Sequence, residues 1–220
     1  YAASLSGEWL SAHGEYPYLL HHSYLGDGTT SNETRKNSDV QNFRIEGSLH
    51  ANFSENESGY LKAYFYNSER GLPGGTILYN EGAFTSQRMW DNTFFVQSHY
   101  ENHFSKLLSL QLNAKYHHGY LHYLDTVVLN SAGFEESYFT QNEYYASASL
   151  LYKAFTNISF SFSTDASVNN MFAQFENAAL TESFAQPVRD SLLSVLAAKY
   201  VSEKVLATAS VLSTLVIETV

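Results

Sequence analysis

The chain has 220 residues, with 17 tyrosines, 15 phenylalanines, no cysteine and a formal net charge of -10. That length suits one large domain or two small ones, and the absence of cysteine excludes disulfides and thiolate metal sites. The acidic balance argues against nucleic-acid binding, which needs a basic face. Charged residues make up 15% of the chain, below the roughly one quarter typical of a soluble domain, and no run of about 18 apolar residues predicts a transmembrane helix.

Strand periodicity begins in residues 4–15 and leads into a polar stretch at 16–40 that is dense in glycine, serine, threonine and asparagine, the residues of turns and loops. The clearest alternation lies in 41–53. Every second residue from Phe43 to Phe53 is apolar or small there, and the residues between them are polar. A strand this long with one fully polar face is unusual in a β-sandwich. It is typical of a barrel with lipid outside and water inside.

The same rhythm continues to the end of the chain. Further strands are expected at about 61–66, 90–104, 108–124, 141–155, 158–165, 189–200 and 205–219. Long connections at 16–40, 67–89, 125–140 and 170–187 alternate with short ones at 54–59, 102–106, 155–157 and 201–204. The predicted fold is therefore all-β, an antiparallel up-and-down meander of about nine long strands forming part of a transmembrane β-barrel. In the last two strands both faces hold Leu, Val, Ala and Ser, so the pattern does not separate inside from outside.

A sheet of about nine strands that is apolar on one face has no core of its own unless it closes or finds a partner. Open edges are not tolerated in lipid, and an odd strand count does not fit a complete bacterial barrel. We therefore expect these residues to be a piece of a longer protein. The alternative is a soluble all-β protein, such as a sandwich or a lipocalin-like barrel. That alternative explains the alternation but not the one-sided distribution of long connections.

Two segments resemble a known family. YFYNSERGLPGG at 64–75, followed by QRMWDNTFFVQSHYENHFS at 87–105, is similar to the barrel of TonB-dependent outer-membrane receptors. In these receptors a strand often ends in Y-x-S-x-R-G-x-P-G and the next opens near R-x-W-D. The resemblance is closest to the cobalamin-receptor-like branch, in forms typical of Bacteroidetes, and extends over essentially the whole chain.

The resemblance implies a 22-stranded barrel in the bacterial outer membrane, plugged by an N-terminal domain, of which residues 1–220 are a partial barrel with no plug visible. It implies active import of a scarce nutrient, cobalamin first and an iron-siderophore or haem second. The implied partners are the TonB complex, through an N-terminal part absent from this chain, membrane lipid and a surface lipoprotein, with no nucleic acid. The alternatives are a passive pore or adhesion barrel, and a soluble β-barrel that binds a small apolar ligand.

Six residues are candidates for ligand contact, namely Arg70, Gly71, Pro73, Tyr79, Phe84 and Tyr138. Glycine and proline change the direction of the chain as it leaves a strand. The Gly-Pro motif therefore either directs a loop toward the ligand or only shapes the barrel rim. Arg70 either contacts ligand or forms an ion pair with Glu69 inside the rim. The three aromatic residues either stack on a flat ligand or belong to loop packing and an aromatic girdle.

Aromatic residues at strand ends, Tyr66, Trp90, Tyr116 and Tyr120, are typical of that girdle. Adjacent histidines such as His117 and His118 point to opposite faces of a strand, so such a pair cannot chelate one metal. We predict no metal site and no cofactor. No G-x-S-x-G, H-E-x-x-H or Gly-rich phosphate loop is present, so the sequence predicts no enzyme.

Overall fold

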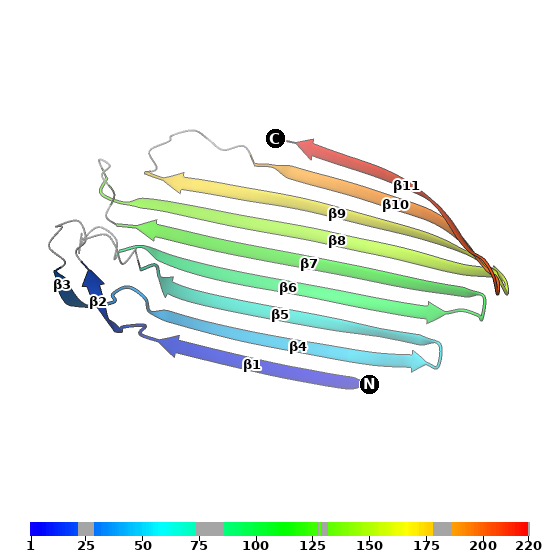
Figure 1. The fold of residues 1–220 in the computed structure, drawn as a ribbon, viewed down its shortest axis with the longest axis horizontal. Helices are drawn as coiled ribbons and strands as arrows, with labels where there is room; N and C mark the ends of the chain where they lie inside the picture. The colour runs from blue at the N-terminus through cyan, green and yellow to red at the C-terminus, as the bar shows by residue number, and fades with distance from the viewer. Residues whose placement is uncertain (22–28, 74–85, 127, 129–131, 178–185, 220) are drawn as a thin grey trace.

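The computed structural model describes residues 1–21, 29–73, 86–126, 128, 132–177 and 186–219. Nine strands form one antiparallel sheet in the order β1-β4-β5-β6-β7-β8-β9-β10-β11, and β2 and β3 form a separate two-stranded sheet (Figure 1). The strands are β1 (Ala2–Ala12), β2 (Pro17–His21), β3 (Thr30–Thr34), β4 (Val40–Ser54), β5 (Glu57–Gly71), β6 (Arg88–His103), β7 (Leu108–Asp125), β8 (Glu135–Phe155), β9 (Ile158–Glu176), β10 (Val188–Val201) and β11 (Leu206–Thr219).

The predicted nine-stranded meander is confirmed. In the main sheet each inner strand pairs with its two neighbours in that order, and β1 and β11 are the edge strands. The short connections between β4 and β5, β6 and β7, β8 and β9, and β10 and β11 lie at one end of the sheet, on the right of Figure 1. The opposite, loop-side end is where the longer connections leave the sheet. Among the described residues, no helix is long and apolar enough to span a membrane.

Several strands extend further toward the loop side than the sequence predicts. β5 continues to Gly71 and β8 begins at Glu135, although 67–71 and 135–140 were expected in connections. β9 likewise continues to Glu176, and β8 and β9 stay in register from Glu136 opposite Glu176 to Lys153 opposite Ser159. The reason is that main-chain pairing holds these segments in the ladder, whereas each of their faces mixes polar and apolar residues and so conceals the alternation of a strand.

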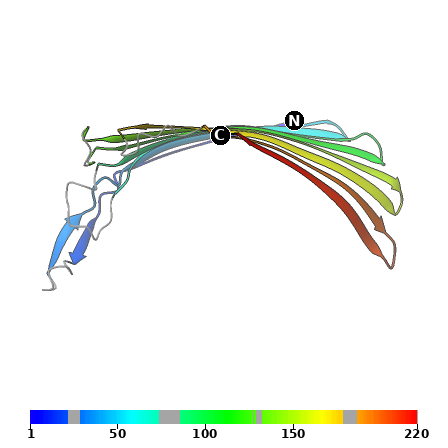
Figure 2. The same cartoon turned by 90° about the horizontal axis from the view of Figure 1, so that it is seen from above.

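The predicted connection 16–40 contains structure of its own. β2 and β3 pair only with each other, and β1 ends at Ala12, earlier than expected. Figure 2 shows the main sheet as an arch, with the β2–β3 hairpin in blue at the lower left, bent toward the hollow side of the arch. The hairpin therefore projects from the loop-side end instead of extending the sheet.

The two faces of the main sheet differ in chemistry. We call the side that carries Ile45 and Leu49 the apolar face; Leu49 lies opposite Leu61, and Ile45 opposite Phe65. No apolar side chain is buried among the described residues. Leu49 is 59% exposed and Leu5, on the same face, 77%. The sheet therefore presents a broad apolar surface without a core of its own.

The register also assigns the faces of the last two strands, which the sequence left open. Leu196 lies opposite Phe162 and so belongs to the apolar face, as does Val211 opposite Leu196. The other face of β10 and β11 carries apolar residues as well, with Val195 opposite Leu212, beside the ion pair of Arg189 with Glu218. These strands therefore have apolar residues on both sides, which explains why their pattern was ambiguous.

Candidate functional site

The second side of the sheet, the polar face, carries cross-strand ion pairs. Lys62 Nζ lies 2.9 Å from Glu46 Oε1, and Lys115 Nζ lies 3.0 Å from Glu143 Oε2. The remaining pairs on this face are Arg44 with Glu8, Arg70 with Asp91 and Arg189 with Glu218. Partly exposed pairs of this kind contribute little stability, about 0–1 kcal/mol each, but they require water or other polar groups around them.

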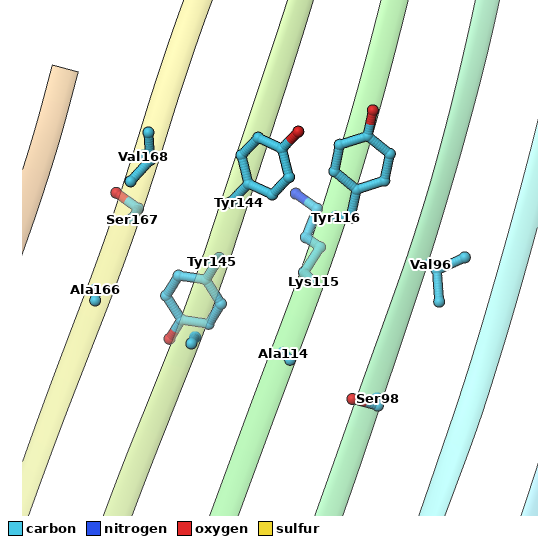
Figure 3. Close-up of a pocket in the computed structure, with 11 residues that line it drawn as sticks. Val96, Ser98, Ala114, Lys115, Tyr116, Tyr144, Tyr145, Ala166, Ser167 and Val168 are labelled. Carbon is cyan, nitrogen blue, oxygen red and sulfur yellow. The ribbon is translucent and has the colours of Figure 1, made fainter. Parts of the chain in front are cut away.

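A hollow of about 460 Å³ lies over small residues of β6–β9. Figure 3 shows Tyr116, Tyr144 and Val168 on the near side of the strands, with Lys115 and Tyr145 behind them. The floor on the near side is formed by residues that oppose one another across the strands, Ser98, Ala114, Ala146 and Ala166. Because this lining is almost entirely apolar, the hollow extends the apolar face and offers no polar binding site.

A row of hydrogen-bonding side chains interrupts the apolar surface on the loop side. His118, Asn142 and Asn170 lie opposite one another on the apolar face. Asn142 Nδ2 donates to Asn170 Oδ1 at 3.0 Å, and the hydroxyl of Tyr116 donates to Asn142 Oδ1 at 3.1 Å. The ring centroids of Tyr116 and Tyr144 are 4.9 Å apart. Tyrosines thus mark the boundary at which the apolar face becomes polar.

The predicted girdle residues do not form one belt. Tyr116 lies at the boundary just described, whereas Trp90 and Tyr120 lie beyond it on the loop side. Tyr66 lies opposite Arg44 and Thr93 on the polar face, so it cannot share a belt with Tyr116. The expectation for Tyr66 is therefore wrong, because its place in the strand alternation sets its side chain on the polar face.

At the loop-side end, the motif around Gly71 meets the segment that follows the β2–β3 hairpin. The amide Nδ2 of Asn37 donates to the carbonyl oxygens of Leu72, at 3.2 Å, and Gln87, at 2.7 Å. The backbone N–H of Leu72 also donates to Gln87 O at 2.9 Å. We call Asn37, Leu72 and Gln87 the rim clasp. It holds the two ends of the β5–β6 connection together.

Ionic groups surround the rim clasp. Arg88 donates to both carboxylate oxygens of Asp39, at 3.2 and 2.8 Å, and to Glu69 Oε1 at 2.8 Å. On the polar face, Arg70 Nη1 lies 2.8 Å from Asp91 Oδ2. Arg70 and Glu69 are thus both ion-paired, as the alternative to ligand contact predicts, but each has a partner on β6 and they do not pair with each other.

The six predicted site residues are only partly brought together. Gly71 is buried and Pro73 O accepts a hydrogen bond from Arg35 at 2.9 Å, so both belong to the rim. Tyr138, expected in a connection, lies in β8, where its ring stacks on His122 with centroids 4.5 Å apart on the apolar-face side. Arg70 points to the opposite face, and Tyr79 and Phe84 lie outside the described residues.

Tyr138 is part of a ladder of three stacked rings. His122 lies between Trp90 and Tyr138, with interplanar angles of 16° and 8°. The Tyr138 hydroxyl donates to Glu136 Oε2 at 2.6 Å, which raises the pKa of Tyr138 to about 12. Because His122 lies between the other two rings, both of its faces are covered, and only the outer faces of Trp90 and Tyr138 and the ring edges remain for contact. The ladder therefore stabilises the strand pairing more than it offers a stacking platform.

The Asp39–Arg88 pair gives a direct electrostatic prediction. The hydrogen bond from Arg88 holds the pKa of the Asp39 carboxyl below its ordinary 3.8. Because the folded pKa is the lower one, the pair stabilises the rim fully above pH 3.8, and this stabilisation is lost as the pH falls through the folded pKa. We expect Arg88→Gln to raise the pKa of Asp39, measured by carboxyl ¹³C NMR titration. Arg44→Gln, which removes the partner of Glu8, serves as the control and should leave Asp39 unchanged.

Sequence reasoning did not identify Asn37, Asp39 or Asp125 as rim residues. Asp125 accepts hydrogen bonds from Ser86 Oγ at 3.2 Å and Gln87 Nε2 at 2.8 Å. The one local signal was the run of turn-forming residues around Asn37, whose φ of 54° is in the left-handed region that asparagine tolerates. Among the described residues, no group of three or more His, Asp or Glu side chains is placed to hold a metal ion.

No protein-family model matches the chain, and no curated protein matches it. The resemblance of 64–75 and 87–105 to TonB-dependent receptors therefore stays a prediction. The described residues form a polar face with ion pairs, an exposed apolar face and a rim held together by hydrogen bonds and ion pairs.

Proposed function

We propose that the chain is part of the wall of a transmembrane β-barrel in a bacterial outer membrane, and that the intact protein is a TonB-dependent receptor. One observation carries the proposal. The described part of the chain folds into a sheet whose apolar side chains are exposed, without a buried apolar side chain, and whose other face carries ion pairs. Exposed apolar surface of this extent marks an interaction site or a membrane contact.

The dimensions of the apolar face support membrane contact. From Phe43 to Phe53 the apolar side of β4 extends about 33 Å along the strand, or about 25 Å of height at the roughly 40° tilt of barrel strands. That height equals the apolar band of outer-membrane barrels, about 25 Å. The tyrosines and amides at Tyr116 and Asn142 fit the interfacial level at its edge.

The length of the strands favours this proposal over a soluble β-barrel. β8 has 21 residues and β9 has 19, whereas a strand needs about 9–11 residues to cross a bilayer and a soluble strand commonly has about 5–6. The surplus lies on the loop side of Tyr144, where the apolar-face side carries polar residues such as Asn142 and Thr140 among its apolar ones. Strands that continue beyond the bilayer would carry the connections well above the lipid surface.

The nutrient-importing role rests on the resemblance and on the rim. The R-G-x-P motif that carries the resemblance lies at the rim clasp, where it shapes the exit of the β5–β6 connection. We propose cobalamin as the first candidate nutrient, and an iron-siderophore or haem as the second. In the intact receptor, loop-side residues would contact the nutrient, and import would require the TonB complex.

A gel and an uptake assay together test the proposal. We expect the intact protein in the outer-membrane fraction as a band several times heavier than 24.7 kDa, whose mobility shifts on boiling. Deletion of its gene should abolish uptake of one radiolabelled nutrient. A soluble band at the chain's own mass would contradict the barrel, unchanged uptake of every candidate would contradict the receptor, and steady open conductance in planar bilayers would support a passive pore instead.

A further inference from the structure

The β2–β3 hairpin is connected to the rest of the molecule through its base. Its strands pair only with each other, and it projects on the hollow side of the sheet (Figure 2). At the base, the backbone N–H of Arg35 donates to Tyr16 O at 2.9 Å, which closes the hairpin. The hydroxyl of Ser38 donates to Gly14 O at 2.6 Å. The segment 35–39 is thus the link between hairpin and sheet.

The same segment holds the neck of the β5–β6 connection, which we define as Leu72, Pro73 and Gln87. One side-chain amide, that of Asn37, donates to the carbonyls of Leu72 and Gln87, which lie on either side of the connection. Arg35 Nη2 donates to the third member of the neck, Pro73 O, at 2.9 Å. Every member of the neck is therefore bonded to the base of the hairpin.

The backbone of the two segments is joined as well. The N–H of Gly71 donates to Asp39 O at 2.9 Å, and Gly71 has no space for a side chain against the carbonyl of Asn37. The bidentate Arg88–Asp39 pair lies beside this contact. Hydrogen bonds that share residues in this way do not break independently, because the loss of one removes the geometry of its neighbours.

We propose that Asn37 and Arg35 make the β2–β3 hairpin and the neck of the β5–β6 connection a single cooperative unit, so that contact of a nutrient with one segment changes the other. Asn37 is then a positioning residue for two loop-side segments that are separate in sequence. The functional meaning of this coupling rests on the proposed receptor. Local opening equilibria couple sites in this manner without a global change of fold.

The simpler alternative is that the bonds of Asn37 anchor the neck alone, while the hairpin is held independently by its own pairing. The two possibilities differ in what a local change does at a distance. A cooperative unit opens as a whole, so a change in either segment alters hydrogen exchange in both. Independent anchors confine the change to the segment that carries the substitution.

Hydrogen exchange on the intact protein in detergent micelles distinguishes a cooperative unit from independent anchors. Asn37→Asp keeps the size of the side chain and its tolerance of positive φ, but replaces the donor by a second acceptor facing two carbonyls. We expect exchange to accelerate roughly tenfold at the Leu72 amide and, equally, at the Arg35 amide and in β2 and β3. Acceleration at Leu72 alone would overturn the proposal. Asn177→Gly, at the other described non-glycine residue with positive φ, is the matched control and should change neither segment.

The reciprocal variant keeps the test decisive if Asn37→Asp perturbs folding. Leu20→Gly weakens the hairpin, because glycine in a strand interior loses side-chain packing and chain entropy, and it lies outside the neck. The proposal expects faster exchange at Leu72 in this variant too, and an unchanged rate there would overturn it. Neither readout depends on transport, so failure of the coupling and failure of the receptor function are distinguishable.

Discussion

The Ala148→Arg substitution is expected to lower the free energy of unfolding of the intact barrel in lipid vesicles by about 2–4 kcal/mol. Ala148 lies on the apolar face, opposite Leu112 and Thr164. It is also midway along β8 between Tyr144 and Tyr152, the tyrosines near the two edges of the apolar band. A guanidinium at this depth would have to be placed in hydrocarbon or distort the bilayer around it. Denaturant titration of the protein in vesicles, followed by tryptophan fluorescence, measures the change.

Two control variants separate the effect of the face of the sheet from the effect of the depth along the strand. Ser149→Arg places the same charge one residue away on the polar face, where the main loss is the 2.9 Å hydrogen bond to Ser163, about 1 kcal/mol. Thr140→Arg keeps the side of the sheet but lies beyond the amide row on the loop side, where the expected cost falls to about 0–1 kcal/mol. Equal costs for Ala148→Arg and Ser149→Arg would contradict the assignment of lipid to the apolar face.

The sequence predicted the central part of the sheet well because the two faces of the sheet differ in polarity. Between Phe43 and Phe53 one side of the strand is apolar and the other polar. Because successive side chains of a strand point to opposite faces, this difference appears in the sequence as an alternation with a period of two. The short turns then fix how neighbouring strands align. The observed opposition of Ile45 with Phe65 also requires the β-bulge between Asn52 and Ser54, because the tight turn alone would place Ile45 opposite Tyr66.

The loop-side parts of the strands were not predicted because their residues lack this alternation. Beyond Tyr144 each face mixes polar and apolar residues. Asn142 and Gln141 are polar, whereas Phe139 contacts Phe175 and Phe172 is 43% exposed. The ladder there is held by main-chain hydrogen bonds, which leave no trace in side-chain periodicity. Segments 135–140 and 170–176 therefore looked like connections although they pair in register.

Only the β5 part of the rim could be predicted from the sequence. Arg70, Gly71 and Pro73 stand out because glycine and proline mark a change of chain direction. Their partner Asn37 is distant in sequence and lies in a polar run without periodicity, so no local spacing relates it to Leu72 or Gln87. Arg70 could be recognised as an ion-pairing residue, but Asp91 could be chosen over Glu69 only from the register of β5 and β6.

The Gly71→Ala substitution is expected to lower the free energy of local opening at the rim by about 1–3 kcal/mol, the usual cost of overpacking a closely packed position. A Cβ at Gly71 would collide with the backbone carbonyl and the side-chain oxygen of Asn37. Backbone cannot move aside as a flexible side chain can, so the segment 37–39 would be displaced. The hydrogen bond from residue 71 to Asp39 O would weaken with it.

Hydrogen exchange at residue 71 measures this cost, and Gly47→Ala is its control. Gly47 also lies in a strand, but a Cβ there meets its nearest atom, Leu5 Cδ1, at an ordinary 3.7 Å, so alanine should be neutral or slightly stabilising. Loss of protection at position 71 with no change at position 47 would show that Gly71 is required for close approach to Asn37. Wild-type protection in Gly71→Ala would contradict a tightly packed rim clasp, and the Gly-Pro motif would then serve only to turn the chain out of β5.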